Sequence, residues 1–242
     1  MKIRDSVAFV TGANRGIGLA FTQALLAAGA RKVYAAARNP EHITLDGVSG
    51  VRLDVTKPDT IGAAGNECTD VNLLINNAGI ALWTGFLGRD SVEAARSEME
   101  TNYFGPLLLS RAFAPILAKN GGGAIVNVLS VLSWVAVPNA GTYSASKAAA
   151  WALTNWLRTA LREQGIQVVG VHAGPVDTDM ASDLTLPKVK PIFVVRQALS
   201  AVEAGRDEVL TDEMTRQVKA GLSDREGIYL NFDPERAVLA AR

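Results

Sequence analysis

The sequence predicts a single α/β domain in which one doubly wound parallel sheet carries helices on both faces. Short apolar segments alternate along the chain with longer segments of helical length and periodicity, as in repeated strand–helix–strand units. Most of the apolar segments are nearly continuous, which is typical of parallel strands that are covered on both faces. The length of 242 residues fits one such domain with a sizeable core.

The expected strands coincide with the apolar segments SVAFV (6–10), KVYAAA (32–37), VRL (51–53), VNLLI (71–75), AIVNVL (124–129) and IQVVGVH (166–172). Helices are expected between them at 16–28, 58–68, 90–118 and 142–163, and NGGG (120–123) ends the third of these before the next strand. Beyond residue 178 the pattern loosens. It predicts a loop at 186–191, a helix at 192–205, a last strand at 207–211 and an irregular tail at 223–242.

Composition and charge exclude several classes of protein. The chain has 24 Lys plus Arg and 24 Asp plus Glu, so it carries no net charge that would favour binding to nucleic acid or to an anionic membrane. The single cysteine, Cys68, excludes a disulfide framework and argues against a thiolate metal site. The start of the chain lacks the apolar region of a secretory signal, and no apolar run approaches the roughly 18 residues of a membrane span. We therefore expect a soluble cytoplasmic protein without a metal.

A glycine-rich turn follows the first strand in VAFVTGANRGIGLAF, with the spacing G-x-x-x-G-x-G. A tight turn, close approach to a pyrophosphate and close helix–strand packing each require a residue without Cβ. The helix that follows presents free N–H groups and the positive end of its dipole to the phosphates. A purely structural turn would not need three glycines, so a Rossmann-type dinucleotide site is expected. Its predicted contacts at this turn are Gly12, Asn14, Arg15, Gly16, Ile17 and Gly18.

The end of the second strand bears on the form of the cofactor. The adenosine ribose would lie there, and a carboxylate would bind its 2′-hydroxyl. The sequence instead has Arg38, whose guanidinium suits a phosphate, and Arg15 could add a second cation. We therefore predict NADP(H) in preference to NAD(H), with a solvated surface charge as the alternative interpretation of Arg38. After the third strand, Asp54 and Val55 are placed to touch the adenine, although Asp54 could equally cap the helix that begins near Lys57.

Five motifs occur in order and at compatible spacing: TGANRGIG (11–18), NNAG (76–79), Asn102 in TNYFG, Ser130, and YSASK (143–147). Together they resemble the short-chain dehydrogenase/reductase family, specifically its compact single-domain branch, over roughly residues 5–180. The resemblance implies a nicotinamide-dependent oxidoreductase that assembles as a homodimer or homotetramer. It also implies a catalytic set that consists of Asn102, Ser130, Tyr143 and Lys147.

Tyr143 and Lys147 lie four residues apart and would share one face of a helix. A free phenol has a pKa of about 10, too high for efficient proton transfer at neutral pH. A neighbouring cation stabilises the phenolate, so we expect Lys147 to lower the pKa of Tyr143. The resemblance implies that Tyr143 is the general acid–base and that Lys147 also bonds the nicotinamide ribose. Taken without the other motifs, an ordinary surface pair is the alternative.

Ser130 ends the fifth strand, at the edge where ligands of parallel sheets bind. Its hydroxyl can donate to a substrate carbonyl oxygen and hold it near Tyr143. Ser133 is a rival whose spacing does not match. The resemblance implies that Asn102 holds a water in a proton path from Lys147, and a helix-bending amide bonded to backbone is a compatible role.

Further cofactor positions are expected after the fourth and sixth strands. Asn76 is also expected to bond the backbone of neighbouring strands, and Thr178 matches the position that contacts the carboxamide in the family. The family's usual Pro-Gly pair is replaced here by Ala173 and Gly174. His172 is interpreted as a satisfied core residue. The full set of these cofactor positions is Asn76, Ala78, Gly79, Gly174, Val176 and Thr178.

A short substrate loop is expected at 179–191. Its apolar residues, with nearby tryptophans as lining or core, suit an aldehyde or ketone. These residues are Met180, Leu184, Leu186, Val189, Trp83 and Trp134, whereas Trp151 and Trp156 are assigned to packing or a subunit contact.

These observations predict an NADP(H)-dependent carbonyl reductase or alcohol dehydrogenase that acts on a small, apolar carbonyl or alcohol. One alternative is an NAD-dependent alcohol dehydrogenase of the same family, and another is a non-enzymatic NADP(H)-binding sensor. The family's longer branch of epimerases and dehydratases usually has a different glycine spacing.

Overall fold

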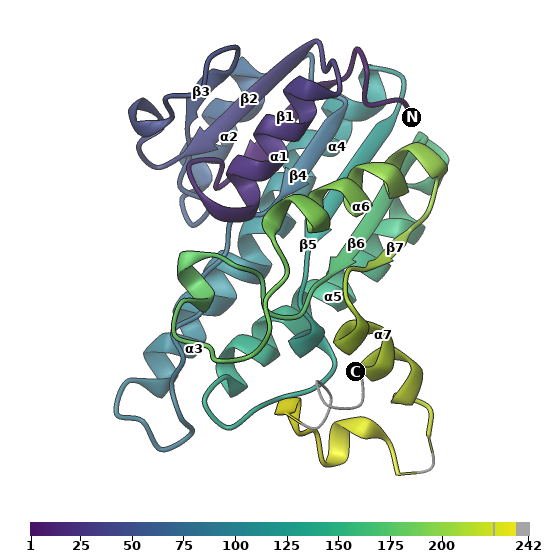
Figure 1. Cartoon of the computed structure of the whole chain (residues 1–242). Coiled ribbons are helices and arrows are strands. Elements are labelled where there is room, and N and C mark those ends of the chain that lie inside the picture. The colour runs from purple at the N-terminus through teal and green to yellow at the C-terminus, as the bar shows by residue number, and fades with distance from the viewer. Residues whose placement is uncertain (225, 236–242) are drawn as a thin grey trace.

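The structure is a computed structural model that describes residues 1–224 and 226–235. Within these residues seven strands form one parallel sheet in the order β3-β2-β1-β4-β5-β6-β7 (Figure 1). The strands are β1 (Val7–Thr11), β2 (Lys32–Ala37), β3 (Ser49–Arg52), β4 (Leu73–Asn76), β5 (Gly123–Val128), β6 (Ile166–His172) and β7 (Glu208–Leu210). The chain winds outward in both directions from β1 and β4, which leaves a crevice at their carboxyl ends. The doubly wound α/β fold predicted from the sequence is confirmed.

Helices cover both faces of the sheet (Figure 1). On one face, α1 (Gly16–Ala27) and α6 (Pro191–Ala204) pack through Phe21 and Val194 into an apolar cluster. On the other face, α2 (Pro58–Glu67), α4 (Gly105–Lys119) and α5 (Gly141–Ala160) form a second cluster. Successive residues of one strand enter different clusters, Ala8 the first and Phe9 the second. This two-sided burial is why the strands are continuously apolar in the sequence.

The long helix expected at 90–118 is interrupted. The structure has α3 (Ser91–Met99), a π-helical segment (Glu100–Phe104) and then α4. Asn102 lies in the π-helical segment and bonds the backbone of Ile80, which ties the widened turn to the segment after β4. Single π-helical turns inside α-helices are frequently found at functional sites.

The C-terminal part of the chain contains a helix that the sequence pattern did not predict, α7 (Glu213–Gly221). Asp212 caps it, because its Oδ1 accepts from the N–H of Thr215 at 2.9 Å. The described residues of the expected tail include a 3₁₀ turn, Ile228–Leu230, and Phe232 packs onto a small apolar cluster with Met214 and Val218. Residues 225 and 236–242 of that tail lie outside the described residues. The predicted loop at 186–191 ends one residue early, since α6 begins at Pro191.

A line of buried amides runs beneath the crevice. Asn76 of β4 and Asn127 of β5 are register partners, and Asn76 Nδ2 donates to Asn127 Oδ1 at 2.8 Å. Asn127 Nδ2 donates in turn to the hydroxyl of Thr154 on α5 at 2.9 Å. The central strands are therefore connected to α5 by side chains as well as by apolar packing.

None of the helices described is long and apolar enough to cross a membrane. In the same part of the chain, no three His, Cys, Asp or Glu side chains gather in a way that could hold a metal ion.

Candidate active site

A cavity of about 780 Å³ opens where the central strands end. The glycine turn after β1 lies at one end of it, and the start of α5 lies at the other. Most of the predicted cofactor residues line this cavity, whereas Gly18 and Asn76 do not. Those that do are Gly12, Asn14, Arg15, Gly16, Ile17, Arg38, Asp54, Val55, Ala78, Gly79, Tyr143, Lys147, Gly174, Val176 and Thr178.

The glycine turn is built without room for side chains. Gly12 and Gly16 have φ values of +64° and +54°, which only glycine adopts without strain. A Cβ on Gly18 would lie 2.1 Å from the carbonyl oxygen of Gly12. The helix that follows starts at Arg15 without a side-chain cap, so its first N–H groups have no side-chain acceptor.

The second asparagine of NNAG, Asn77, holds the glycine turn in place, and the sequence analysis did not single it out. Its Nδ2 donates to the carbonyl oxygens of Thr11 at 2.9 Å and Gly12 at 3.3 Å. Asn76, which was expected to bond strand backbone, bonds the side chains of Asn127 and Ser110 instead. The difference arises because β4 ends at Asn76, so Asn77 is the residue that emerges beside β1.

Arg38 lies on the cavity wall at the end of β2, beside Asp54. The carboxylate of Asp54 does not cap α2: it accepts from the N–H and hydroxyl of Thr56 at 3.0 and 2.7 Å. Burial raises the pKa of Asp54, but the bonds from Thr56 and the cations Lys57 and Arg38 outweigh it, so its pKa is lowered. Asp54 is therefore an anion already engaged by its neighbours.

Arg15 and Arg38, which were expected to converge, both line the cavity, and Arg15 is engaged in an ion pair there. Its Nη1 lies 2.9 Å from Oδ2 of Asp179, in the loop after β6, and both side chains are largely exposed at 68% and 74%. The ion pair connects the glycine turn to the start of the predicted substrate loop.

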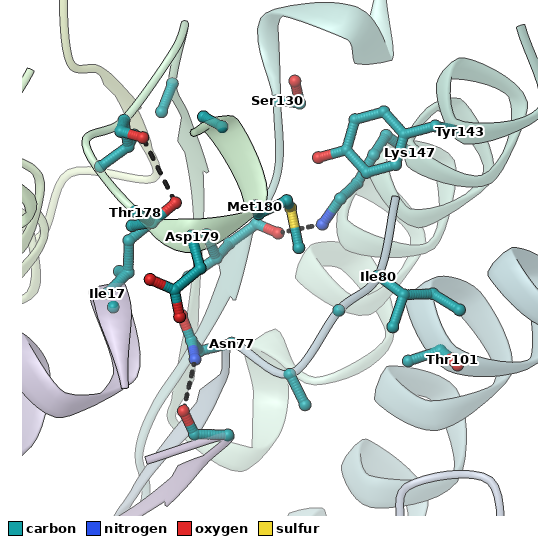
Figure 2. Close-up of a pocket in the computed structure, with 18 of the residues that line it drawn as sticks. Ile17, Asn77, Ile80, Thr101, Ser130, Tyr143, Lys147, Thr178, Asp179 and Met180 are labelled. Atoms are coloured by element: carbon teal, nitrogen blue, oxygen red, sulfur yellow. Dashed lines mark hydrogen bonds between the residues drawn. The ribbon is translucent and has the colours of Figure 1, made fainter. Parts of the chain in front are cut away.

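Tyr143 and Lys147 occupy the first turns of α5, and both are buried. Lys147 Nζ donates to the carbonyl oxygen of Val128 at 2.9 Å and lies 5.7 Å from the centre of the Tyr143 ring. Figure 2 shows the phenol oxygen and the amine directed toward one space in the cavity, and Ser130 is near enough to interact with the phenol. The structure thus brings together three of the four residues predicted to be catalytic.

The pKa of Tyr143 differs from the expectation. Burial raises it to about 12, with a further increase from the charge of Glu98 and an opposing effect from hydrogen bonding to Ser130. Burial also lowers the pKa of Lys147 to about 8. The prediction that Lys147 keeps the phenol acidic is therefore not met, because removal from water disfavours the charged form of both groups. At neutral pH the phenol holds its proton and most of the lysine remains cationic.

Asn102, the fourth predicted catalytic residue, does not line the cavity. Its amide is fully engaged, with Oδ1 accepting from Ile80 N at 2.9 Å and Nδ2 donating to Ile80 O and Ser146 Oγ at 2.9 Å each. Ser146 Oγ donates to the carbonyl oxygen of Tyr143 at 2.7 Å. The backbone-bonded amide considered from the sequence is the arrangement that the structure has.

Ser130 faces the cavity, while the rival Ser133 supports it from behind. Ser133 Oγ accepts from the N–H of Ser130 at 3.3 Å, and His172 Nδ1 lies 3.3 Å from the carbonyl oxygen of Ser130. Burial lowers the pKa of His172 to about 3, so the ring is neutral. His172 was expected to be a core residue with both ring nitrogens hydrogen-bonded. Only Nδ1 has a partner, because Nε2 has none among the described residues.

The substrate end of the cavity has apolar walls. The residues that line it as expected are Met180, Leu184, Leu186 and Trp83. Val189 packs against the apolar core instead, and Trp134 stacks on His172 with the ring centres 3.9 Å apart. Trp151 packs edge-on against Trp134, and Trp156 is exposed. The lining residues that were missed include Met214, Phe232 and Pro234. They come from α7 and the segment after it; Asp212 before an amphipathic run was the available signal for that helix.

Comparison with known proteins agrees with this geometry. The sequence model of the family described as short chain dehydrogenase matches residues 6–188. A crystal structure of a short chain dehydrogenase from Burkholderia cenocepacia J2315 in complex with NADP is 43% identical, with a TM-score of 0.89, and the match covers 93% of this chain and 96% of that one. A short chain dehydrogenase/reductase from Burkholderia phymatum in complex with NAD is 26% identical, with a TM-score of 0.82 and coverage of 97% and 98%.

Among curated relatives, dehydrogenase/reductase SDR family member 7B from mouse (Mus musculus) is 34% identical over 74% of this chain. That match spans only 60% of the mouse protein's length. The family model covers most of the chain, and strands β1 to β6, the glycine turn and the Tyr143–Lys147 pair all lie within the matched residues. The chain therefore belongs to the short-chain dehydrogenase/reductase family of oxidoreductases.

Proposed function

We propose that the protein is an NADP(H)-dependent oxidoreductase that reduces an apolar aldehyde or ketone to the alcohol, or catalyses the reverse reaction. The observation that carries the proposal is the buried Tyr143–Lys147 pair beside Ser130, at one end of a cavity whose other end is a glycine turn.

The residues at the glycine turn fit a dinucleotide. The crowding at Gly18 and the left-handed Gly12 leave bare backbone, which a pyrophosphate can approach closely. The uncapped N–H groups at the start of α1 would donate to phosphate oxygens. Lys147 and Thr178, farther along the cavity wall, would hold the nicotinamide half. When bound, a reduced nicotinamide supplies a hydride.

The chain's own residues would orient the substrate and supply a proton. Ser130 Oγ would donate a hydrogen bond to the carbonyl oxygen. Tyr143, whose pKa of about 12 keeps the phenol protonated, would give its proton to that oxygen as negative charge develops on it. Lys147, cationic below a pKa of about 8, would stabilise the phenolate that results.

The preference for NADP(H) over NAD(H) rests on the end of β2. Arg38 lies on the cavity wall, and among the described residues no hydrogen bond engages its guanidinium. It would pair with a 2′-phosphate. The nearest carboxylate, Asp54, already accepts two hydrogen bonds from Thr56 and is poorly placed to bind a ribose hydroxyl as well. The NADP complex of the Burkholderia cenocepacia relative supports the same preference.

The substrate class rests on the apolar walls around Tyr143. Trp83, Met180 and Leu186 offer no fixed charge to a bound molecule, so a compact apolar carbonyl compound fits best. Phe232, from the segment after α7, adds a further apolar lining residue to the same cavity.

The test is reduction of a panel of aldehydes and ketones, followed at 340 nm with NADPH and with NADH. Tyr143→Phe is expected to lower kcat by about 100-fold or more while leaving NADPH affinity nearly unchanged. Tyr229→Phe, which removes a hydroxyl from an exposed residue outside the cavity, is the matched control and should behave as the wild type. Full activity in Tyr143→Phe would remove the phenol as the acid, and turnover of no compound in the panel would contradict the proposal.

A further inference from the structure

The segment after β4 is anchored to the neighbouring helix at two points. Asn102 bonds the N–H and the carbonyl oxygen of Ile80, both at 2.9 Å. One helical turn earlier, Glu98 Oε1 accepts from the N–H of Leu82 at 2.7 Å. Side chains four residues apart on a helix share a face, so the two residues act as adjacent clamps on one stretch of backbone.

The residue immediately after the second clamp, Trp83, is held in an unfavourable backbone conformation. Its φ is +50°, in the left-handed region that a bulky aromatic residue rarely adopts. Such a conformation persists only where the surroundings impose it. The indole lines the cavity, and its ring centre lies 5.7 Å from that of Tyr143. Trp83 is thus a wall of the space in front of the phenol.

The burial of the Glu98 carboxylate has a cost in free energy. It is fully buried on α3, and its Oε2 has no hydrogen-bond partner among the described residues. A carboxylate removed from water is destabilising unless its interactions compensate, and each bond to a charged group is correspondingly strong. The charge also raises the pKa of Tyr143, which reflects how near the carboxylate lies to the phenol.

We propose that Glu98 is a positioning residue that, through the N–H of Leu82, holds Trp83 against Tyr143 and thereby sets which carbonyl compounds are reduced. Trp83 is the specificity-determining residue through which it acts. The inference rests on the proposed function, because a wall beside Tyr143 selects a substrate only if Tyr143 acts on one.

The first part of the test measures the clamp without any substrate. Amide hydrogen exchange, read by mass spectrometry on peptides that contain residues 80–84, is compared between the wild type, Glu98→Leu and Glu98→Gln. We expect exchange in Glu98→Leu to be at least about tenfold faster, since the acceptor for Leu82 is lost. Glu98→Gln keeps an acceptor oxygen and should match the wild type. Glu93→Leu removes an exposed carboxylate from the same helix and should also match it.

The second part measures selectivity as the ratio of kcat/KM for acetophenone to that for propanal, with NADPH. Trp83→Ala should lower this ratio by about tenfold or more, because the larger substrate loses an apolar wall. Glu98→Leu should lower it to a similar extent with NADPH affinity unchanged, and Glu98→Gln should restore the wild-type ratio. In the double variant Trp83→Ala/Glu98→Leu the loss should equal that of Trp83→Ala alone, since both changes remove the same wall.

The results that would overturn the inference differ from the result that would overturn the proposed function. Unchanged exchange in Glu98→Leu, a ratio in Glu98→Gln as low as in Trp83→Ala, or additive losses in the double variant would overturn the inference. If Glu98→Leu does not fold, Glu98→Ala, which also lacks an acceptor for the N–H of Leu82, replaces it in both measurements with the same expected results. If the wild type reduces no compound of the panel, the proposed function fails, while the exchange data still report whether Glu98 holds the segment.

Discussion

Replacing Lys147 by Met should make the stability of the protein respond to pH in a different way. The ammonium is buried beside Tyr143 and donates to the carbonyl oxygen of Val128, and burial lowers its pKa from 10.5 to about 8. In the unfolded chain the same lysine keeps its proton until about pH 10.5. Between these two values the unfolded state binds more protons than the folded state, so the free energy of unfolding rises with pH.

The magnitude follows from the two pKa values. At pH 7 the lysine is charged in both states, and the folded state carries the full penalty of about 3 kcal/mol for the buried charge. At pH 10 the folded lysine is neutral while the unfolded one is still mostly charged, and less than about 1 kcal/mol of the penalty remains. The wild type should therefore gain between about 2 and 3 kcal/mol relative to Lys147→Met from pH 7 to pH 10. Groups other than residue 147 titrate in both proteins and largely cancel.

Urea unfolding of both proteins at the two pH values measures this difference directly. Lys119→Met, which alters an exposed lysine at the end of α4, is the matched control and should leave the difference between the two pH values unchanged. A wild-type gain of less than about 0.5 kcal/mol, the usual error of such comparisons, would refute the conclusion that Lys147 is desolvated.

Three further predictions concern the cofactor site and assembly. Gly18→Ala should weaken NADPH binding by about tenfold or more, because the new Cβ lies 2.1 Å from the carbonyl oxygen of Gly12. Gly141→Ala, whose Cβ meets nothing within 4 Å, should bind NADPH normally, and a fluorescence titration with NADPH measures the affinity of both variants. Asp179→Asn releases Arg15 from an exposed ion pair worth at most about 1 kcal/mol, so the ratio of NADPH to NADH affinity should rise by up to about fivefold; a fall in that ratio would contradict this. Sedimentation should give a dimer or tetramer mass, and a monomer mass at all concentrations would contradict the expected self-association.

Features that depend only on short stretches of sequence could be predicted. The strands of a parallel sheet are covered on both faces, so their burial is visible as uninterrupted apolar runs, and β2 and β6 have the predicted bounds. The glycine turn and the four-residue spacing of Tyr143 and Lys147 are equally local. Both could be placed from the sequence because each depends on a few neighbouring residues and on the order of strand and helix.

Features that depend on contacts between distant segments were not predictable. The π-helical turn at Asn102 hardly changes the apolar periodicity, since it is fixed by bonds to Ile80 in another segment. Asn77 bonds strand backbone in place of Asn76, because β4 ends at Asn76 and Asn77 is the residue that emerges beside β1. The pKa of Tyr143 was misjudged because spacing along a helix reveals the neighbouring cation but not the loss of water around both groups. Phe232 reaches the cavity only through packing onto α7.

The paired amides of Asn76 and Asn127 bear on how the centre of the sheet assembles. If β4 slid by one residue against β5, the amide of Asn76 would turn to the opposite face, meet aliphatic side chains there and lose Asn127 as its partner. Each polar group stranded in this way would destabilise the misaligned sheet by about 1–3 kcal/mol, whereas the bond from Asn127 to Thr154 on α5 would remain. The two asparagines thus favour the native alignment of β4 and β5 over one that is shifted by a residue.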